Sequence, residues 1–299
     1  MSKILLYAIP LLVLISAEPV FATTTTTTSP FITRAASAVV LDETGAEIAA
    51  KNPDAVRSIA SLTKLMTAMV LLDANLDFNQ VVTYEPKTHY AYKNYLHIKR
   101  GEQFRALDLW FAMLTGSLNI ETRMLVAASG VPERTFIDKM NIKASVLGLE
   151  KTKFVNVTGL PPDLTGAKNK KEDNVSTARE LGQLFYEAMK YPAIAGALGT
   201  PFYTFTEVRD LDNKSEHSFS HTNYLYKEAL PYRVIASKTG YTEQAGACFI
   251  TKTKSKAGEY TIVTLGDKEY YRRFDEPKRL AEWALLHKWV RAAGKAAGK

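Results

Sequence analysis

Residues 58–72 read SIASLTKLMTAMVLL, and the rest of the chain is organised around this stretch. Its apolar positions 62, 65, 66, 69, 70 and 72 recur at helical spacing and predict a helix with one buried face. Ser61 lies at the predicted helix start, where free backbone N–H groups collect. Lys64 follows three residues later, on the same side of the first turn. This pattern is typical of a serine nucleophile paired with a lysine base, although a capping serine beside a solvated lysine has the same spacing.

The first 33 of the 299 residues are predicted to precede the folded domain. Lys3, an apolar run over residues 4–17 and small residues before position 23 predict a signal peptide, residues 1–22. The alternative is a membrane anchor, for which the run is short. Residues 23–33 contain six consecutive threonines and are predicted to be a leader without regular structure. The sequence therefore predicts export, to a periplasm or to the cell wall.

Net charge and cysteine content indicate which binding partners and cross-links to expect. The net charge of +7 favours an acidic wall polymer or anionic lipid headgroups, and nucleic acid is not expected because no basic-aromatic module is present. Cys248 is the single cysteine and lies in an apolar run, so we expect a buried thiol and no internal disulfide. No metal site and no cofactor are predicted.

Hydrophobic periodicity predicts a hairpin, then a helical middle, then strands and a last helix. The predicted elements are the hairpin 37–50, helices at 106–114, 120–128, 133–147 and 176–191, strands at 202–206, 232–237, 247–252 and 260–265, and a helix at 276–290. This order indicates an α+β fold, with one antiparallel sheet built from both chain ends and a mainly helical lobe inserted between them.

Three motifs each occur once: Ser61-Leu62-Thr63-Lys64, Ser117-Leu118-Asn119, and Lys238-Thr239-Gly240 followed by Tyr241-Thr242. About one S-x-x-K is expected by chance in such a chain, so each motif alone is weak. In this order, on a helix start, an inter-helix loop and a strand end, they resemble the motifs of the penicillin-recognising serine enzymes.

Longer blocks resemble the low-molecular-mass penicillin-binding proteins, the D-alanyl-D-alanine carboxypeptidase and endopeptidase family. They are IASLTKLMTA at 59–68, FVNVTGL at 154–160, HTNYL at 221–225, KTGYT at 238–242 and RFDE at 273–276. The likeness covers residues 34–290, the predicted catalytic domain, and leaves 291–299 as a basic tail. It implies the penicillin-binding, serine β-lactamase-like fold. One departure is that the family continues its second motif with Asn-Asp-Ala, whereas Asn119 is followed here by Ile120-Glu121.

The resemblance implies a serine-type D-Ala-D-Ala carboxypeptidase that acts on peptidoglycan stem peptides and that β-lactams inhibit. Ser61 would form the acyl-enzyme, Lys64 would act as the base, and Ser117 would relay a proton. Lys64 must be neutral for this role, and burial beside a second lysine lowers its pKa in that direction. The implied substrate-binding residues are Asn119, Lys238, Thr239, Gly240, Tyr241, Thr242 and Arg273.

These binding residues would have distinct tasks in the implied site. Asn119 would hold the substrate amide. Backbone N–H groups of Ser61 and Tyr241 would form the oxyanion hole. Thr239, Thr242 and Arg273 would bind the terminal carboxylate of the substrate.

Four other functions fit parts of the sequence. A serine β-lactamase needs a deacylating glutamate, and neither Glu150 nor Glu172 has the expected E-x-x-L-N setting. A zinc hydrolase could use His217 and His221, but this pair lacks the glutamate of H-E-x-x-H. A wall-binding protein without activity would not be expected to keep the three motifs. An endopeptidase is the remaining alternative to the carboxypeptidase.

The region after Lys238 bears on that last alternative. About 60 residues follow it, enough for the sheet and its helix but not for the extra C-terminal domain or amphipathic anchor of many family carboxypeptidases. The tail 291–299 has no apolar face, so no membrane anchor is predicted there. This short form resembles the soluble endopeptidases of the family, whereas carboxypeptidases are the more prevalent members. Carboxypeptidase is the prediction, with endopeptidase as the alternative.

Overall fold

The computed structural model describes residues 32–161, 164, 172–209 and 215–297 of the chain. The chain divides into residues 1–30 and 31–299, and only the second unit contains described residues. The predicted signal peptide and almost all of the predicted leader therefore lie outside the described residues.

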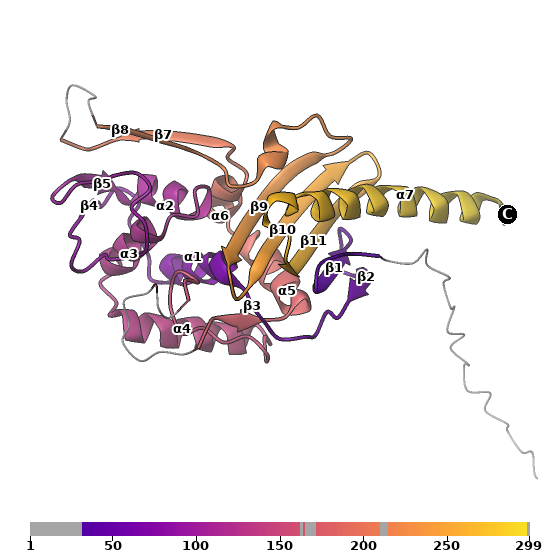
Figure 1. The fold of residues 1–299 in the computed structure, drawn as a ribbon, viewed down its shortest axis with the longest axis horizontal. Coiled ribbons are helices and arrows are strands. Elements are labelled where there is room, and N and C mark those ends of the chain that lie inside the picture. Colours follow the sequence, from indigo (N-terminus) through magenta and orange to yellow (C-terminus); the bar gives the residue numbers. More distant parts are fainter. Residues whose placement is uncertain (1–31, 162–163, 165–171, 210–214, 298–299) are drawn as a thin grey trace, which may run out of the picture. The chain divides into compact units, whose positions relative to one another are not determined.

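A five-stranded antiparallel sheet joins the two ends of the unit (Figure 1). The strand order is β2-β1-β11-β10-β9, so the N-terminal hairpin pairs with the C-terminal strands, and Val39 faces Val263 across β1 and β11. This confirms the predicted sheet. The strands are β1 (Ser37–Leu41), β2 (Glu47–Lys51), β9 (Arg233–Thr242), β10 (Gly246–Ser255) and β11 (Gly258–Asp267).

Strand β9 is longer than its apolar pattern predicts. It runs on to Thr242, so the Lys238-Thr239-Gly240 motif lies inside the strand and not at its end. The tight turn to β10 explains this length, because the Thr242 hydroxyl accepts a hydrogen bond from Ala245 N at 3.0 Å. The polar residues after Ser237 hide the strand from a hydrophobicity pattern, although they pair with β10 throughout.

The elements outside the sheet follow the prediction with some differences. Helix α6 and the 3-10 helices η3 and η4 were not predicted, α7 continues to Ala297 into the predicted tail, and the short strand pairs were missed apart from β7. The helices are η1 (Ala60–Thr63), α1 (Lys64–Asp73), α2 (Ala106–Leu114), α3 (Asn119–Ala128), α4 (Glu133–Val146), α5 (Ala178–Ala188), α6 (Pro192–Leu198), η3 (Tyr224–Lys227), η4 (Tyr270–Arg272) and α7 (Asp275–Ala297). The pairs are β3 (Arg57–Ser58) with β6 (Val175–Ser176), β4 (Val81–Thr83) with β5 (Gln103–Arg105), and β7 (Phe202–Thr206) with β8 (Glu216–Ser220).

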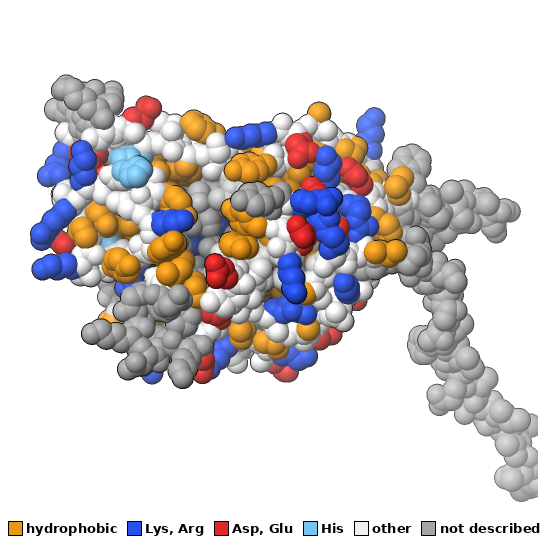
Figure 2. Space-filling model, viewed as in Figure 1, with side chains coloured by type: hydrophobic (Ala, Val, Ile, Leu, Met, Phe, Trp, Pro, Cys, Tyr) orange, Lys and Arg blue, Asp and Glu red, His pale blue; other side chains and the backbone are white. Residues whose placement is uncertain are grey.

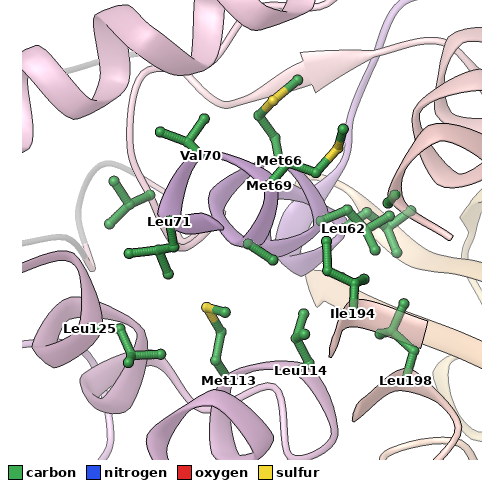
Figure 3. Packing of buried hydrophobic residues seen from close by; sticks show 14 of the residues in the cluster. Leu62, Met66, Met69, Val70, Leu71, Met113, Leu114, Leu125, Ile194 and Leu198 are labelled. Atoms are coloured by element: carbon green, nitrogen blue, oxygen red, sulfur yellow. The ribbon is translucent and has the colours of Figure 1, made fainter. Parts of the chain in front are cut away.

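Helix α1 is the centre of the hydrophobic core. In Figure 3, Leu71 lies on the side of Leu125 from α3, and Leu62, from the turn before α1, lies near Ile194 and Leu198 of α6. Met66 and Met69 point to the opposite side of the helix. Residues 64–71 are all buried, so the prediction of one buried face was wrong. Its neighbours α2 to α6 enclose it, and a helix enclosed in this way has no solvent face to leave polar. The consequence for the site is that Lys64, at the start of α1, is buried with the rest.

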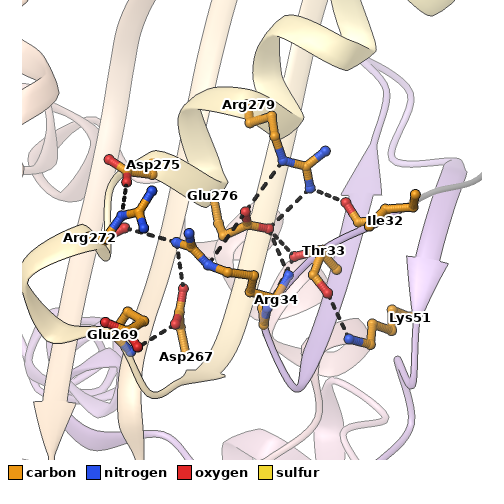
Figure 4. A network of polar contacts seen from close by, with 11 residues as sticks. Ile32, Thr33, Arg34, Lys51, Asp267, Glu269, Arg272, Asp275, Glu276 and Arg279 are labelled. Carbon is orange, nitrogen blue, oxygen red and sulfur yellow. Dashed lines mark hydrogen bonds and ion pairs between the residues drawn. The ribbon is translucent and has the colours of Figure 1, made fainter.

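A polar network fixes the start of α7 against the N-terminal segment (Figure 4). The Glu276 carboxylate accepts hydrogen bonds from Thr33 Oγ1 at 2.6 Å and from Arg34 N at 2.9 Å, and Arg279 pairs with it at 3.1 Å. Burial alone would raise the pKa of Glu276, but the bonds from Arg279, Thr33 and Arg34 hold it at about 2. The network thus holds the turn before α7, which carries Arg273.

No helix in the described part of the chain combines the length and the apolar character that a membrane span requires.

Candidate active site

Three chain segments converge on the backbone at Ser61. Ala60, just before it, has a left-handed φ of 45°, which is uncommon outside glycine. Gly159 lies against it so closely that a Cβ there would be 1.9 Å from the Ala60 carbonyl oxygen. A Cβ on Gly240 of β9 would be 3.0 Å from Ser61 N. Glycine at 159 and 240 therefore lets two backbones pack directly against the 3-10 turn that carries Ser61.

Lys64 makes three hydrogen bonds at the start of α1. Its Nζ lies 3.0 Å from Ser61 Oγ, 2.7 Å from Asn119 Oδ1 and 2.8 Å from the Thr158 carbonyl oxygen. The last two atoms can only accept, so they hold two lysine protons. The third position of the amine faces the serine hydroxyl. In neutral Lys64 that position is a lone pair, which can take the proton of Ser61.

Burial sets the protonation of both lysines in the cleft. It lowers the pKa of Lys64 to about 7, while the negative charge of Glu121 acts in the opposite direction. Burial also lowers the pKa of Lys238 well below its ordinary value, and the charge of Lys64 adds to that shift. Two fully buried amines thus lie in one site, where protonating either one disfavours protonating the other.

The second motif lies between α2 and α3 and faces both lysines. Ser117 has a left-handed φ of 60°, and its Oγ lies 2.5 Å from Lys238 Nζ. Asn119 is the first residue of α3 and directs its amide oxygen at Lys64. The structure therefore forms two hydrogen-bonded groups from the predicted residues, Ser61 with Lys64 and Asn119, and Ser117 with Lys238. The Ile120-Glu121 departure does not prevent this arrangement.

The remaining predicted residues line a cleft of about 840 Å³ around Ser61, with Tyr92, Lys93, Tyr95 and Leu160 among its other walls. Thr239, Gly240, Tyr241 and Thr242 line it from β9, and Arg273 from the turn before α7. The guanidinium carbon of Arg273 lies 4.3 Å from the ring centroid of Tyr270 and 4.9 Å from the ring centroid of Phe274. The two carboxylates that follow Arg273 in the sequence have other partners, since Asp275 pairs with Arg272 at 2.9 Å and Glu276 belongs to the network of Figure 4.

Several supporting residues were not singled out from the sequence. Asn156 Oδ1 accepts from Thr158 N and Gly159 N, and Asn174 bonds the backbone of Asn156 and the hydroxyl of Thr63. These bonds fix the loop whose Thr158 carbonyl binds Lys64. A side-chain motif does not identify a functional backbone carbonyl. The sequence signal for this loop was the FVNVTGL block at 154–160, which resembles the family.

Glu121 was noted only as a departure from the family motif, yet it is buried, with 3% of its surface exposed. Burial raises the pKa of Glu121 to about 7, although a bond to its own backbone and the charge of Lys64 act in the opposite direction. This buried carboxyl lies two residues after Asn119, which accepts a hydrogen bond from Lys64. Such perturbed groups concentrate at functional sites.

The histidines and the cysteine behave as expected from the sequence. His217 lies on strand β8, and so not on the helix that the H-E-x-x-H arrangement requires. His221 is buried, and its Nδ1 accepts from Asn223 N at 2.9 Å. Cys248 is buried, and burial raises the pKa of its thiol to about 12. Among the described residues, no cluster of three His, Cys, Asp or Glu side chains could hold a metal ion.

Comparisons with known proteins agree with this site. A family model described as D-alanyl-D-alanine carboxypeptidase matches residues 23–269. A D-alanyl-D-alanine endopeptidase of Pseudomonas aeruginosa is 31% identical over 249 residues, which make up 83% of this chain and 76% of that relative.

Solved structures show the same fold. A D-alanyl-D-alanine carboxypeptidase from Mycobacterium tuberculosis H37Rv has a TM-score of 0.73 and 25% identity, covering 84% of this chain and 91% of that one. Penicillin-binding protein D2 from Listeria monocytogenes, solved in an ampicillin-bound form, has a TM-score of 0.70 and 27% identity, covering 86% of this chain and 99% of that one.

The class is therefore that of the penicillin-binding proteins, with their serine β-lactamase-like fold. Within it, the chain belongs to the D-alanyl-D-alanine carboxypeptidase family of serine peptidases. The family resemblance and the fold class predicted from the sequence are confirmed.

Proposed function

We propose that this protein is a serine-type D-alanyl-D-alanine carboxypeptidase that acts on peptidoglycan stem peptides through an acyl-enzyme on Ser61. The observation that carries the proposal is the contact of Lys64 Nζ with Ser61 Oγ at 3.0 Å, with two acceptors holding the other lysine protons. That geometry directs the lysine lone pair at the nucleophile. Burial supports the same role, because it lowers the pKa of Lys64 to about 7.

The first half of the reaction uses the two motifs that face Ser61. Ser61 Oγ attacks the carbonyl carbon of the penultimate D-alanine while Lys64 takes its proton. Backbone N–H groups of Ser61 and Tyr241 stabilise the resulting oxyanion. The C–N bond then breaks, and the Ser117 hydroxyl, 2.5 Å from Lys238 Nζ, gives its proton to the departing amine. The proton that Lys64 took from Ser61 replaces it, so that Ser117 is again a hydroxyl and Lys64 is neutral. D-alanine leaves.

Water completes the cycle. It attacks the ester carbon and gives a proton to neutral Lys64, which passes that proton to Ser61 Oγ as the ester C–O bond breaks. The shortened peptide leaves as a free acid. Asn119 holds the substrate amide, and Thr239, Thr242 and Arg273 bind the carboxylate of the leaving group. Gly240 lets β9 approach the nucleophile, since any Cβ there would meet Ser61 N at 3.0 Å.

The test is incubation of the purified protein with a stem pentapeptide ending in D-Ala-D-Ala. Mass spectrometry should detect the tetrapeptide and one equivalent of D-alanine. An intact pentapeptide after exposure to an enzyme that benzylpenicillin can still acylate would overturn the carboxypeptidase assignment.

A D,D-endopeptidase is the second candidate. The relative from Pseudomonas aeruginosa, 31% identical, bears that name. In an endopeptidase the leaving amine belongs to a second stem peptide, so the leaving group is much larger than D-alanine. Digestion of purified cross-linked dimeric muropeptides distinguishes the two activities, because only an endopeptidase converts them to monomers.

β-Lactams are proposed as covalent inhibitors, supported by the ampicillin-bound form of the Listeria monocytogenes protein. Export, with removal of residues 1–22 and action in a periplasm or cell wall, is proposed from the sequence alone. N-terminal sequencing of the mature protein tests this, with a first residue near Thr23 expected. Neither a nucleic acid partner nor a stable membrane anchor forms part of the proposal.

A further inference from the structure

The connection from β4 to β5 carries three exposed side chains into the catalytic cleft: Tyr92, Lys93 and Tyr95. Lys93 Nζ lies 5.1 Å from the ring centroid of Tyr92 and 5.9 Å from that of Tyr95, within the range of cation–π attraction. The two rings remain 39% and 58% exposed. An ammonium group thus lies close to two rings in the cleft that Ser61 also lines.

Hydrogen bonds and buried side chains fix the loop that carries Tyr92, Lys93 and Tyr95. Arg123 of α3 donates to the Tyr90 carbonyl oxygen at 2.8 Å, and the Asn94 side chain closes a turn by bonding both N and O of Ile98. Ala91 and Ile98 are buried. The anchored loop therefore presents the residues between these points to the cleft instead of folding them away.

Lys93 itself has a left-handed φ of 62°. For a long side chain that conformation has a cost in free energy, and such strain is concentrated at functional positions. Among the residues that the structure describes, no carboxylate forms an ion pair with Lys93. The two rings therefore orient the positive charge of Lys93, and no carboxylate among the described residues neutralises it.

The charge pattern of this region agrees with an anionic ligand. Figure 2 shows hydrophobic and basic side chains next to one another on the part of this face over α3, β4 and β5. The cleft volume, about 840 Å³, lies in the upper part of the roughly 300–1,000 Å³ range of sites that enclose a drug-sized ligand. There is room for more of the substrate than its two terminal residues.

We propose that Tyr92, Lys93 and Tyr95 form a subsite for the free α-carboxylate of a γ-linked acidic residue in the acyl-donor part of the stem peptide, upstream of the scissile bond. Arg273 approaches the cleft from the sheet side and is proposed to bind the carboxylate of the leaving group. Lys93 approaches from the helical lobe. It is proposed to bind the acyl part of the peptide, which stays attached to Ser61 after the leaving group departs. This inference rests on the proposed function.

The experiment compares two synthetic pentapeptides that share a D-Ala-D-Ala end. In one, the second residue is a γ-linked D-glutamate with a free α-carboxylate; in the other, that carboxylate is a primary amide. The wild-type enzyme should show about fivefold higher kcat/KM for the acid, the upper range of an exposed ion pair. High salt should reduce this preference, because the pair is accessible to solvent.

Lys93→Gln should remove the preference by slowing only the acid peptide, and Lys93→Glu should reverse it. Lys99→Gln is the matched control, since Lys99 is an exposed lysine of the same loop outside the cleft lining. Benzylpenicillin should still label Ser61 with one equivalent in all three variants, whatever the rate, which reports that the reaction centre is folded.

The outcomes separate the two hypotheses. If the wild type cleaves both peptides equally, or if Lys93→Gln slows both alike, the subsite is wrong while the peptidase assignment stands. If the folded wild type cleaves neither peptide, the proposed function fails and the subsite fails with it.

Discussion

The reaction centre and the rim of the same cleft differ sharply in burial. Lys64 and Lys238 have no exposed surface and are fully engaged in hydrogen bonds, whereas Tyr95 and Tyr241 at the rim are 58% and 44% exposed. Burial controls protonation in the centre, because it makes a charged amine unfavourable. Burial has little influence on protonation at the rim, where exposed charged and aromatic side chains are available to contact the substrate. We therefore expect substitutions in the centre to abolish activity and substitutions at the rim to change which substrate is preferred.

The largest effect is expected for Ser61→Ala. Benzylpenicillin should add one drug mass to a wild-type peptide that contains Ser61, and the variant should not be labelled. Its thermal stability should remain close to that of the wild type, because the lost hydroxyl has one polar contact within the side-chain network, Lys64 Nζ.

Ser129→Ala is the matched control, since Ser129 Oγ bonds only local backbone at the end of α3. It should be labelled as the wild type is. Labelling of folded Ser61→Ala at another residue, or an unlabelled wild type, would contradict the assignment of the nucleophile.

Gly159→Ala tests whether close backbone packing shapes the centre. Gly159 has a φ of 81°, and a Cβ there would lie 1.9 Å from the Ala60 carbonyl oxygen. The free energy of unfolding should fall by about 2–4 kcal/mol, and acylation should slow because Ala60 must move. Thermal melts and penicillin acylation rates measure both effects.

Gly130→Ala separates backbone strain from the clash. Gly130 also has a positive φ, 68°, but no atom lies within 4 Å of the place where a Cβ would be. Its cost should be about 1–2 kcal/mol, the strain of a left-handed residue alone. Equal losses in the two variants would show that the contact with Ala60 does not constrain the site.

The sequence predicted the elements better than their surroundings. Local patterns were sufficient for the hairpin and for α2 with its exact bounds. They failed where tertiary contacts dominate. Helix α1 is buried on all sides by neighbours distant in sequence, and β9 continues through polar residues because β10 pairs with them.

The site divides in the same way. The motif residues were predictable because their side-chain types carry the chemistry. The Thr158 carbonyl, which binds Lys64, was not, because its position depends on the bonds of Asn156 and Asn174 within the folded loop. Nor does sequence alone show that Lys93 lies close to two rings.

Arg273→Ala tests the rim on its sheet side. Asp275 pairs with Arg272, so the guanidinium of Arg273 rests on Tyr270 and Phe274 and is available to a substrate carboxylate. A charge-assisted bond of about 1.5–3 kcal/mol corresponds to a one- to two-order loss in kcat/KM, since 1.36 kcal/mol is tenfold.

Amidating the substrate's terminal carboxylate should have the same effect on the wild type and little further effect on the variant. Arg272→Ala is the control, because Arg272 is an exposed neighbour paired with Asp275. An Arg273→Ala enzyme that cleaves acid and amide substrates as the wild type does would remove Arg273 from the carboxylate site.

The smallest effect is expected for Glu121→Gln, which keeps the shape of the side chain and removes its charge. The negative charge of Glu121 raises the pKa of Lys64 and so opposes the effect of burial, which brings that pKa to about 7. Without this charge the pKa of Lys64 should fall, and more of the lysine should be neutral near pH 7, where Glu121 of the wild type is partly charged. The acid limb of the acylation rate should therefore move to lower pH.

A pH profile of acylation by a chromogenic cephalosporin measures this shift. The variant should be faster than the wild type near pH 7, where Glu121, with its pKa of about 7, still carries part of its charge and Lys64 is partly protonated. At pH 6 the two should approach each other because Glu121 is then largely neutral, and well above pH 7 they should converge because Lys64 is neutral in both. Glu187→Gln is the matched control, since Glu187 pairs with Lys190 on the surface of α5 and should leave the profile unchanged. A limb that stays in place or moves to higher pH in Glu121→Gln would mean that the buried carboxyl does not influence the base.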